Sequence, residues 1–288
     1  MNAPSSLIEA RAARLLGWTP RSWRAVAGGY TPARRYVVEG GGERAFVKVA
    51  TTSLTAAYLR GEIAAYEAVR APFIPRLIGW DEDPAEPMLA IEDLSHALWP
   101  PPWDGKAVDR VLDAIAAMHA TAAALKTFAV RHGDNLRPGW AMVAAAPAAF
   151  LSLGMASADW LAGALPALVE AEAACVTAGT ALTHWDLRSD NMCLTPQGAM
   201  FIDWSGACLS DPTLDLGTWL PSLAFEGGPL PDDILPGAPE VAAWVSGFFA
   251  ARAGEPDIPD APFVRRVQRE QLSTALPWVT RALGLPQP

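Results

Sequence analysis

Two short segments carry a candidate base and oxygen ligands at a spacing that suits phosphoryl transfer. In HWDLRSDN, which begins at His184, Asp186 precedes Asn191, and FIDW further along ends an apolar run with Asp203. An aspartate can accept the proton of an attacking hydroxyl, and asparagine and aspartate oxygens can hold a magnesium ion that bridges nucleotide phosphates. The pattern therefore predicts Asp186 as the base and Asn191 and Asp203 as ligands of Mg²⁺.

A lysine upstream suits the nucleotide phosphates. The run AFVKVA places Lys48 in an alternating strand, where it shares a face with Phe46. A lysine in such a strand costs free energy on burial unless an anion compensates it. Glu62, on the helix that follows, is the predicted partner, and Glu67 on the same helix is the alternative.

Strands are predicted for most of the chain before residue 95. The runs RSWRAVAGGY, RRYVVEGGGERAFVKVA and EPMLAIEDL are rich in β-branched and aromatic residues and are separated by glycine turns. YVVE and ERAFVKV predict a hairpin with its loop at residues 40–42. Apolar residues at helical spacing predict one helix over 54–66, which must end before Pro72.

Helices are predicted for most of the chain after Leu94. Helical patterns cover residues 109–125 and approximately 156–178, 240–253 and 262–284, with two short strands, MCL and AMFID, around a PQG turn. We therefore predict an α+β fold with two lobes. Residues 1–94 form a small antiparallel β lobe with one helix, which binds the nucleotide, and residues 95–288 form a larger, mainly helical lobe with the catalytic loop and the substrate site.

The composition limits the class of protein. Hydrophobic residues make up 51% of the chain and charged residues 18%, which indicates a folded globular protein. The formal net charge of −9 argues against binding to nucleic acid. Cys175, Cys193 and Cys208 fit no zinc pattern and predict reduced thiols. Because no signal-peptide or membrane-spanning pattern occurs, we expect a cytoplasmic protein without membrane partners, either monomeric or dimeric.

Together these segments resemble the aminoglycoside phosphotransferase and choline kinase family, which shares its fold with protein kinases. GGYT resembles the nucleotide loop of that family, LRGEIAAYEAV with FIPRLIGW its helix-and-strand block, and AIEDL its hinge. HWDLRSDN and FIDWSGACLSDPTLDLG resemble its catalytic and metal-binding segments. The resemblance runs from about residue 24 to about residue 220 and implies a two-lobed, protein-kinase-like fold.

On the nucleotide side, the resemblance implies that Lys48 and Glu62 grip the α and β phosphates of ATP or GTP. The motif LRGE favours Glu62 over Glu67 as the partner of Lys48. Backbone groups of the loop and of the hinge are expected to bind the nucleotide. The residues concerned are Gly28, Gly29, Tyr30 and Thr31 in the loop, and Glu92, Asp93 and Leu94 in the hinge.

On the acceptor side, the resemblance implies that Asp186 is the base or orients the attacking hydroxyl. Arg188 falls where it can act on the transferred phosphoryl group in the transition state. Asp211 and Asp215 match a segment that braces the catalytic loop, and His184 is expected to hold backbone.

Departures from the family pattern narrow the substrate. GGYTPARR lacks a full G-x-G-x-x-G, and Pro32 stiffens the loop. No activation segment separates Asp203 from Asp211, which disfavours a protein kinase and favours a small-molecule acceptor. We expect a small-molecule O-phosphotransferase that moves the γ-phosphate of a nucleoside triphosphate to a hydroxyl of an antibiotic, such as an aminoglycoside or a nucleoside type, and so confers resistance. The alternatives are a metabolic kinase of choline, amino-sugar or thiosugar type, and a non-catalytic nucleotide-binding module.

Some residues have both a functional and a structural interpretation. Trp99, Trp103 and Trp140 are candidates for an aromatic platform at the acceptor site, although buried tryptophans mostly anchor packing. His119, on an apolar helix face, is expected to be a hydrogen-bonded core histidine. Four acidic residues either meet amino groups of a cationic acceptor or belong to a solvated loop; they are Glu226, Asp232, Asp233 and Glu240.

Overall fold

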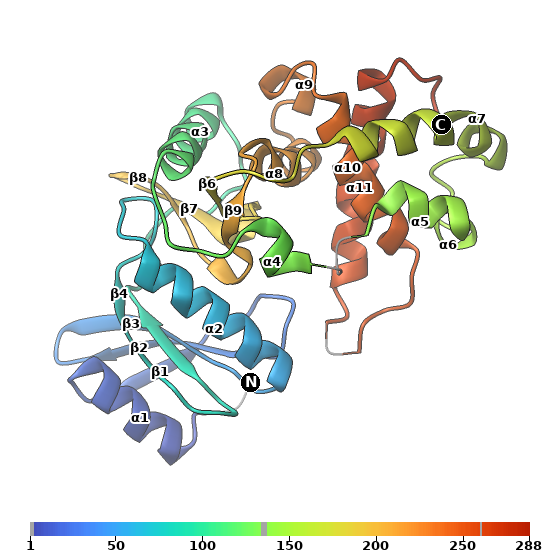
Figure 1. Ribbon diagram of the computed structural model, residues 1–288. Helices are drawn as coiled ribbons and strands as arrows, with labels where there is room; N and C mark the ends of the chain where they lie inside the picture. Colours follow the sequence, from blue (N-terminus) through green and yellow to red (C-terminus); the bar gives the residue numbers. More distant parts are fainter. Residues whose placement is uncertain (1–2, 134–136, 260) are drawn as a thin grey trace. The chain divides into compact units, whose positions relative to one another are not determined.

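The protein consists of two compact units (Figure 1). The structure, a computed structural model, describes residues 3–133, 137–259 and 261–288. The first unit takes in the chain up to residue 100 together with residues 123–125 and 190–207. The second takes in residues 101–122, 126–189 and 208–288.

A five-stranded antiparallel sheet is the centre of the first unit. Its strands are β1 (Ser22–Ala25), β2 (Arg34–Gly40), β3 (Glu43–Val49), β4 (Leu77–Asp81) and β5 (Met88–Ile91), and they lie in the order β1-β2-β3-β5-β4. Gly41 and Gly42 join β2 to β3 with φ angles of 63° and 89°. Two-residue hairpin turns need such positive φ angles, which glycine adopts at little cost. The predicted hairpin is confirmed.

A helix that the sequence analysis missed opens the first unit. Helix α1 (Ser6–Leu16) begins where the Ser5 side chain accepts from the Ile8 amide and ends at Gly17, whose φ is 76°. Its apolar face packs into the core beside the sheet through Ile8, Ala12 and Leu16. No helix was predicted there, although the apolar residues of this N-terminal segment recur at helical spacing.

The second helix of the first unit positions part of the candidate site. Helix α2 (Ser53–Ala68) is capped by Thr52 and ends before Pro72, as predicted. It packs against the short 3₁₀ helix η3 (Trp204–Gly206), which follows the hairpin of β7 (Met192–Thr195) and β8 (Gly198–Phe201). Residues far apart in sequence therefore meet beside α2.

The second unit is mainly helical. Its elements are α3 (Gly105–His119), α4 (Phe128–His132), α5 (Gly139–Ala145), α6 (Ala148–Leu151), α7 (Ala158–Ala174), β6 (Ala181–Thr183), β9 (Cys208–Ser210), α8 (Thr213–Phe225), α9 (Pro231–Ile234), α10 (Pro239–Ala253) and α11 (Val264–Ala282). Strands β6 and β9 pair in antiparallel fashion. Helix α10 packs against α5, α7 and α11. Most of the long helical patterns in the sequence correspond to these helices.

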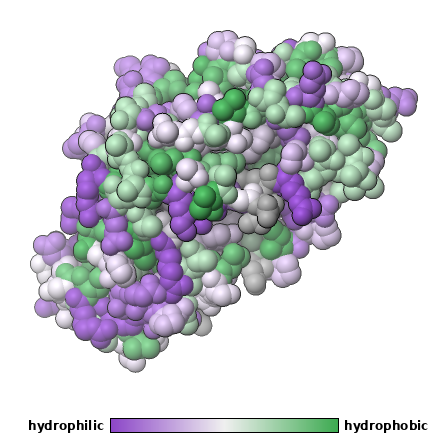
Figure 2. Space-filling model, in the orientation of Figure 1, coloured by the Kyte–Doolittle hydropathy of each residue, from purple (hydrophilic) through white to green (hydrophobic). Residues whose placement is uncertain are grey.

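The two units agree with the predicted α+β class, since one is built on an antiparallel sheet and the other on helices. The division places residues 190–207 with the first unit, whereas the sequence analysis assigned everything after residue 94 to the second lobe. The three cysteines are free thiols. On the face shown in Figure 2, hydrophilic and apolar residues are interspersed. Among the described residues, no helix combines the length and the apolar character that crossing a bilayer requires.

Candidate active site

Lys48 is the centre of a charged cluster in the first unit. Its ammonium lies 2.7 Å from Oε2 of Glu62 and 3.0 Å from Oδ1 of Asp203. Lys48 lies on β3, Glu62 lies on α2, and Asp203 immediately precedes η3. The ion pair predicted between Lys48 and Glu62 is confirmed. The alternative partner, Glu67, instead accepts a hydrogen bond from the indole of Trp80.

Charge compensation holds this cluster together. Lys48 is 8% exposed and Glu62 only 2%. Burial lowers the pKa of Lys48, but the carboxylates of Asp203 and Glu62 more than offset that effect, so its pKa lies above the ordinary value. Burial raises the pKa of Glu62, and the ammonium of Lys48 opposes that rise. Lys48 is therefore cationic at neutral pH.

Asn191 and Asp203 lie at the same end of the β7–β8 hairpin. The register pairs Met192 with Phe201, and the amide of Ile202 donates to the carbonyl of Asn191 at 2.9 Å. Asp203 follows with φ 60° and ψ 55°, a left-handed conformation that is uncommon for a residue other than glycine. The hairpin thus brings an amide oxygen and a carboxylate together.

This donor set fits a magnesium ion. Mg²⁺ takes hard oxygen ligands and is commonly held by one or two protein side chains together with substrate phosphates. Asn191 and Asp203 would supply such oxygens, and the ammonium of Lys48 lies 3.0 Å from Asp203. Within the described ranges, no group of three or more His, Cys, Asp or Glu side chains forms a metal cage. A site completed by nucleotide phosphates is the arrangement that the residues support.

Arg35 was not predicted as a site residue, although its side chain forms hydrogen bonds to the glycine loop. The guanidinium of Arg35 donates to the carbonyls of Thr31 and Ala33 at 3.3 and 2.9 Å. Gly28 and Gly29 have φ angles of 115° and 75°. A Cβ on Gly29 would lie 2.4 Å from a guanidinium nitrogen of Arg35, so a larger residue there would displace the guanidinium as well as strain the backbone. In the strand register Arg35 is opposite Lys48.

A signal for Arg35 was present in the sequence. The hairpin pairs Gly40 with Glu43, and counting back along both strands pairs Arg35 with Lys48. Paired residues in an antiparallel ladder share a face, so a two-residue loop at Gly41 and Gly42 places Arg35 beside the lysine, whereas the predicted loop of residues 40–42 would have placed Arg34 there.

The three hinge residues take part in local contacts of the first unit. Oε1 of Glu92 accepts from the amide of Arg76 at 2.7 Å, and Oδ1 of Asp93 accepts from the amide of Ser95 at 3.0 Å. The carbonyl of Leu94 accepts from the indole of Trp99 at 3.3 Å. The side chains of Glu92 and Asp93 therefore stabilise the segment itself.

The catalytic loop of the second unit is held by a buried carboxylate. Asp215, on α8, is fully buried and accepts from the amides of His184 and Trp185 at 3.1 and 2.7 Å. Nε2 of His119 lies 3.0 Å from Oδ2 of Asp215, in agreement with the expected core histidine. The ring nitrogen Nδ1 of His184 accepts from the amide of Asp186 at 3.3 Å. His184 and Asp215 thus fix the backbone at Asp186.

Asp186 and Arg188 lie side by side in this loop. Nε of Arg188 is 3.7 Å from Oδ1 of Asp186. The side chain of Asp186 is about half exposed, at 49%, whereas that of Arg188 is 13% exposed. A carboxylate open to solvent, such as Asp186, can accept a proton from a hydroxyl. The neighbouring guanidinium of Arg188 can place a positive charge near a transferred phosphoryl group.

The structure corrects the interpretation of one of the three candidate tryptophans. Trp140 is fully buried on α5, where its indole donates to Ser246, so it cannot line an acceptor site. The indole of Trp103 donates to Oε2 of Glu226 at 2.7 Å. Trp99 belongs to the first unit and is 38% exposed.

Most of the acidic residues offered for a cationic acceptor already have partners. Glu226 accepts from the hydroxyl of Ser189 in the catalytic loop as well as from Trp103. Asp232 forms an ion pair with Arg281 at 2.5 Å, and Asp233 accepts from the amide of Leu230. The contacts of these three carboxylates stabilise the second unit.

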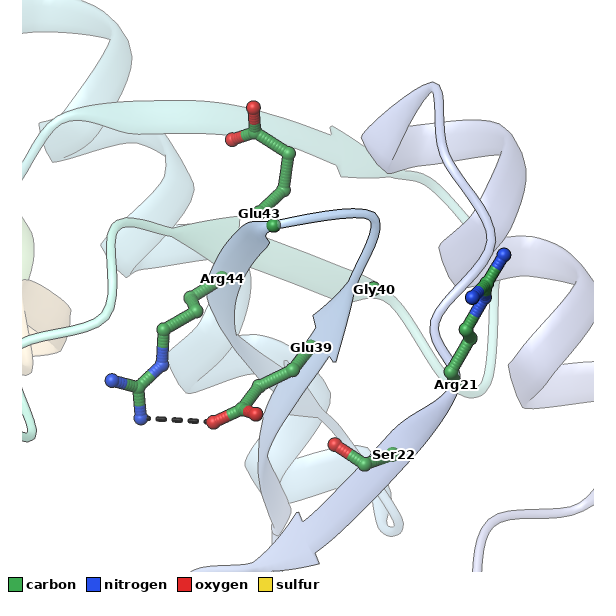
Figure 3. Close-up of a pocket in the computed structure, with 7 residues that line it drawn as sticks. Arg21, Ser22, Glu39, Gly40, Glu43 and Arg44 are labelled. Carbon is green, nitrogen blue, oxygen red and sulfur yellow. Dashed lines mark ion pairs between the residues drawn. The ribbon is translucent and has the colours of Figure 1, made fainter.

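A surface cavity of about 370 Å³ lies away from the charged cluster, at the turn end of the β2–β3 hairpin (Figure 3). Glu39 and Arg44, which line it, form an ion pair at 3.0 Å. They are paired in register four residues along the strands from Arg35 and Lys48, roughly 13 Å away. None of the predicted site residues lines this cavity.

Comparison with known proteins gives a family and several similar folds. The model of the phosphotransferase enzyme family, APH, matches residues 22–253. No curated protein matches the chain at a significant level. Aminoglycoside phosphotransferase APH(4)-Ia, as a thermostable mutant in a ternary complex with ADP and hygromycin B, has a TM-score of 0.61 at 12% identity, covering 96% of this chain and 99% of that chain.

Two other solved structures have similar values. Spectinomycin phosphotransferase APH(9)-Ia in complex with ADP and spectinomycin has a TM-score of 0.60 at 12% identity, covering 99% of this chain and 100% of that chain. Amicoumacin kinase hAmiN in complex with AMP-PNP, Ca²⁺ and Ami has a TM-score of 0.56 at 12% identity, covering 94% and 93%. Because the family model spans most of the chain, the protein belongs to the phosphotransferase enzyme family and is a kinase, as its resemblance to aminoglycoside phosphotransferases and choline kinases predicts.

Proposed function

We propose that this kinase transfers the γ-phosphoryl group of ATP or GTP to a hydroxyl of a small molecule, and that the acceptor is a hydroxylated antibiotic. The observation that carries the proposal is the ammonium of Lys48 held between the carboxylates of Glu62 and Asp203. A buried cation fixed by two carboxylates, one of them a candidate metal ligand, is suited to gripping a nucleotide and poorly explained by packing alone.

On the donor side, Lys48 binds the α and β phosphates and Glu62 keeps its ammonium in place. The loop from Gly28 to Thr31 covers the phosphates with backbone amides. Asn191 and Asp203 hold the magnesium ion. That ion would supply positive charge to offset the negative charge of the phosphates.

On the acceptor side, Asp186 orients the attacking hydroxyl and accepts its proton. The O–P bond forms between that hydroxyl and the γ-phosphorus as the bond to the β-phosphate oxygen breaks. Arg188 places a fixed cation beside Asp186, where charge develops on the transferred group. Asp215 and His184 contribute by holding the loop in one conformation, which reduces the reorganisation needed in each turnover.

Two observations support an antibiotic as the acceptor. The solved structures with similar folds include proteins described as aminoglycoside and spectinomycin phosphotransferases and as an amicoumacin kinase. In the sequence, the step from Asp203 to Asp211 is short, which leaves no room for the segment with which protein kinases bind peptides.

The test is an assay of nucleoside-diphosphate release with ATP and with GTP. The acceptor panel contains aminoglycosides, nucleoside and peptide antibiotics, choline and small sugars, and mass spectrometry then identifies the phosphorylated product. Turnover of an antibiotic that disappears in Asp186→Asn and persists in Asp190→Asn, an exposed aspartate of the same segment, supports the proposal. Turnover confined to choline or sugars makes the protein a metabolic kinase. Nucleotide binding without any turnover points to a binding module.

A further inference from the structure

A cluster of aromatic side chains extends from the catalytic loop to helix α10. This cluster, called the aromatic cluster below, consists of Phe128, His132, Trp185, Trp244 and Phe248. Trp185, immediately before Asp186 in sequence, lies with its ring centroid 4.8 Å from that of Phe128, 4.9 Å from His132 and 5.2 Å from Trp244. Trp244 stacks on Phe248 at 6.3 Å with an interplanar angle of 17°. All of these residues belong to the second unit.

Part of this cluster remains exposed. Phe128 is buried with Cys208 and Leu214, whereas the side chains of Trp185, Trp244 and Phe248 are only half-buried. Four other tryptophans of the chain are fully enclosed. Trp140, Trp204, Trp219 and Trp278 are each at most 1% exposed. The partly open rings therefore present aromatic surface beside the catalytic loop.

Trp185 has a backbone conformation that is unfavourable for a bulky residue. Trp185 has a φ of 74°, a left-handed conformation that a bulky residue rarely adopts. The carboxylate of Asp215 holds it there by accepting its amide hydrogen at 2.7 Å. Glycine would adopt this conformation without strain. An indole kept at such a position, next to the proposed base, indicates that its ring has a use.

Charged groups of both signs occur in the second unit. Glu226, Asp232 and Asp233 are bound to Ser189, Arg281 and the Leu230 amide, respectively. The outer end of the aromatic cluster carries a cation instead, because the guanidinium of Arg252 lies 4.2 Å from the ring centroid of Phe248. Carboxylates also lie close to the cluster, since Asp186 follows Trp185 in sequence and Glu240 precedes Trp244 by one turn of α10.

We propose that Trp185, Trp244 and Phe248 form an acceptor subsite that binds a planar aromatic ring. The acceptor is then a hydroxylated compound with an aromatic group, whose ring lies against the cluster while its hydroxyl reaches Asp186. Aromatic faces and edges attract one another beyond simple burial, so the subsite discriminates in favour of such rings. This inference rests on the proposed function, since it assigns the substrate class of the same site.

The test compares matched probes that differ only in the ring. One pair is a 4-nitrophenyl glycoside and the methyl glycoside of the same sugar, and the other is a nucleoside and its free pentose. Binding is measured by calorimetry on Asp186→Asn, which separates binding from turnover. We expect the aromatic member of at least one pair to bind at least tenfold more tightly. Equal affinities within both pairs would overturn the inference.

Substitutions locate the effect. Trp244→Leu and Phe248→Leu keep an apolar side chain and should each weaken binding of the aromatic probe about five- to tenfold, the loss expected for an aromatic contact. Trp80→Leu is the control, because Trp80 is an exposed tryptophan of the first unit. Unchanged thermal melting shows that the variants fold, and Trp185→Phe serves as a milder variant if one does not. Normal probe affinity in the folded variants would contradict the subsite.

The two proposals fail in different ways. Aromatic-probe binding that depends on Trp244, without phosphoryl transfer to any compound, would refute the proposed function and leave the subsite standing. Conversely, efficient phosphorylation of polycationic aminoglycosides that is unaffected by Trp244→Leu would refute the subsite and leave the kinase assignment intact.

Discussion

Arg35 stands opposite Lys48 in the β2–β3 ladder, so two cations share one face of the sheet beside the glycine loop. The charge of Arg35 acts to lower the pKa of Lys48, against the effects of Asp203 and Glu62. Two cations held this close gain from an anion with several oxygens, and a nucleotide phosphate is such an anion. We therefore propose Arg35 as a further phosphate-binding residue beside Lys48.

Replacing Arg35 should weaken nucleotide binding. Arg35→Ala removes a cation and the donors that hold Thr31 and Ala33, so we expect about a tenfold loss of affinity for Mg²⁺-ADP, corresponding to one charge-assisted contact. Calorimetric titration measures it. Arg34→Ala is the matched control, since Arg34 is exposed and pairs with Val49 in the ladder. An equal effect of both substitutions would mean that only overall charge matters.

Glu62 and Glu67 allow a direct test of the ion pair. Glu62→Gln removes a charge 2.7 Å from Lys48 and should lower kcat at least tenfold, because the ammonium is no longer held toward the phosphates. Glu67→Gln should have little effect, since Glu67 is exposed and bonds to Trp80. Steady-state kinetics with both variants distinguishes them. A loss of activity in Glu67→Gln alone would reverse the assignment.

Asp215 should matter for both stability and turnover. The two carboxylate oxygens of Asp215 accept from the amides of His184 and Trp185. In Asp215→Asn an NH₂ group replaces one of these oxygens, and it cannot accept a hydrogen bond. We expect a destabilisation of about 1–3 kcal/mol, the usual cost of unsatisfied buried polar groups, together with a fall in kcat as the loop at Asp186 loosens. Urea unfolding and kinetics measure the two effects. Asp113→Asn, on the exposed side of α3, is the control, and equal stability of the two variants would contradict the bracing role.

The sequence predicted the charged cluster well because its members are marked by local patterns. Lys48 sits in an alternating strand and Asp203 ends an apolar run, so each was found without knowing that their side chains lie 3.0 Å apart. The helix offered both Glu62 and Glu67, and the resemblance of LRGE to the family motif decided for Glu62. Residue type, spacing and element were sufficient wherever the chemistry requires one particular side chain.

Features that depend on tertiary packing were not predicted. Trp140 was considered for the acceptor site and Trp185 was not, because a tryptophan in a sequence does not show how far its ring is enclosed. Trp140 is buried against Ser246, whereas Trp185 is partly open. The partners of Glu226 also lie far along the chain, so its carboxylate looked available for a ligand.

Glu172 should give the stability of the second unit a distinctive pH dependence. This carboxylate on α7 is 4% exposed and accepts from the amides of Gly139 and Trp140 at 2.6 and 2.9 Å. Burial raises its pKa from 4.5 to about 7, although those backbone amides oppose the rise. The folded protein therefore binds a proton there more tightly than the unfolded chain does.

The sign follows from linkage. Between pH 4.5 and about 7 the folded state holds more protons at Glu172 than the unfolded state, so the free energy of unfolding falls as the pH rises through this window. Below pH 4.5 Glu172 is protonated in both states, so the stabilisation that its raised pKa gives the folded state is fully present. Glu172→Gln cannot titrate, so its stability relative to the wild type should increase from pH 5 to pH 8 in urea unfolding experiments. Glu170→Gln, an exposed neighbour on α7, should follow the wild-type curve. A constant difference between wild type and Glu172→Gln would show that the carboxylate is already ionised at pH 5, because the backbone amides then outweigh burial.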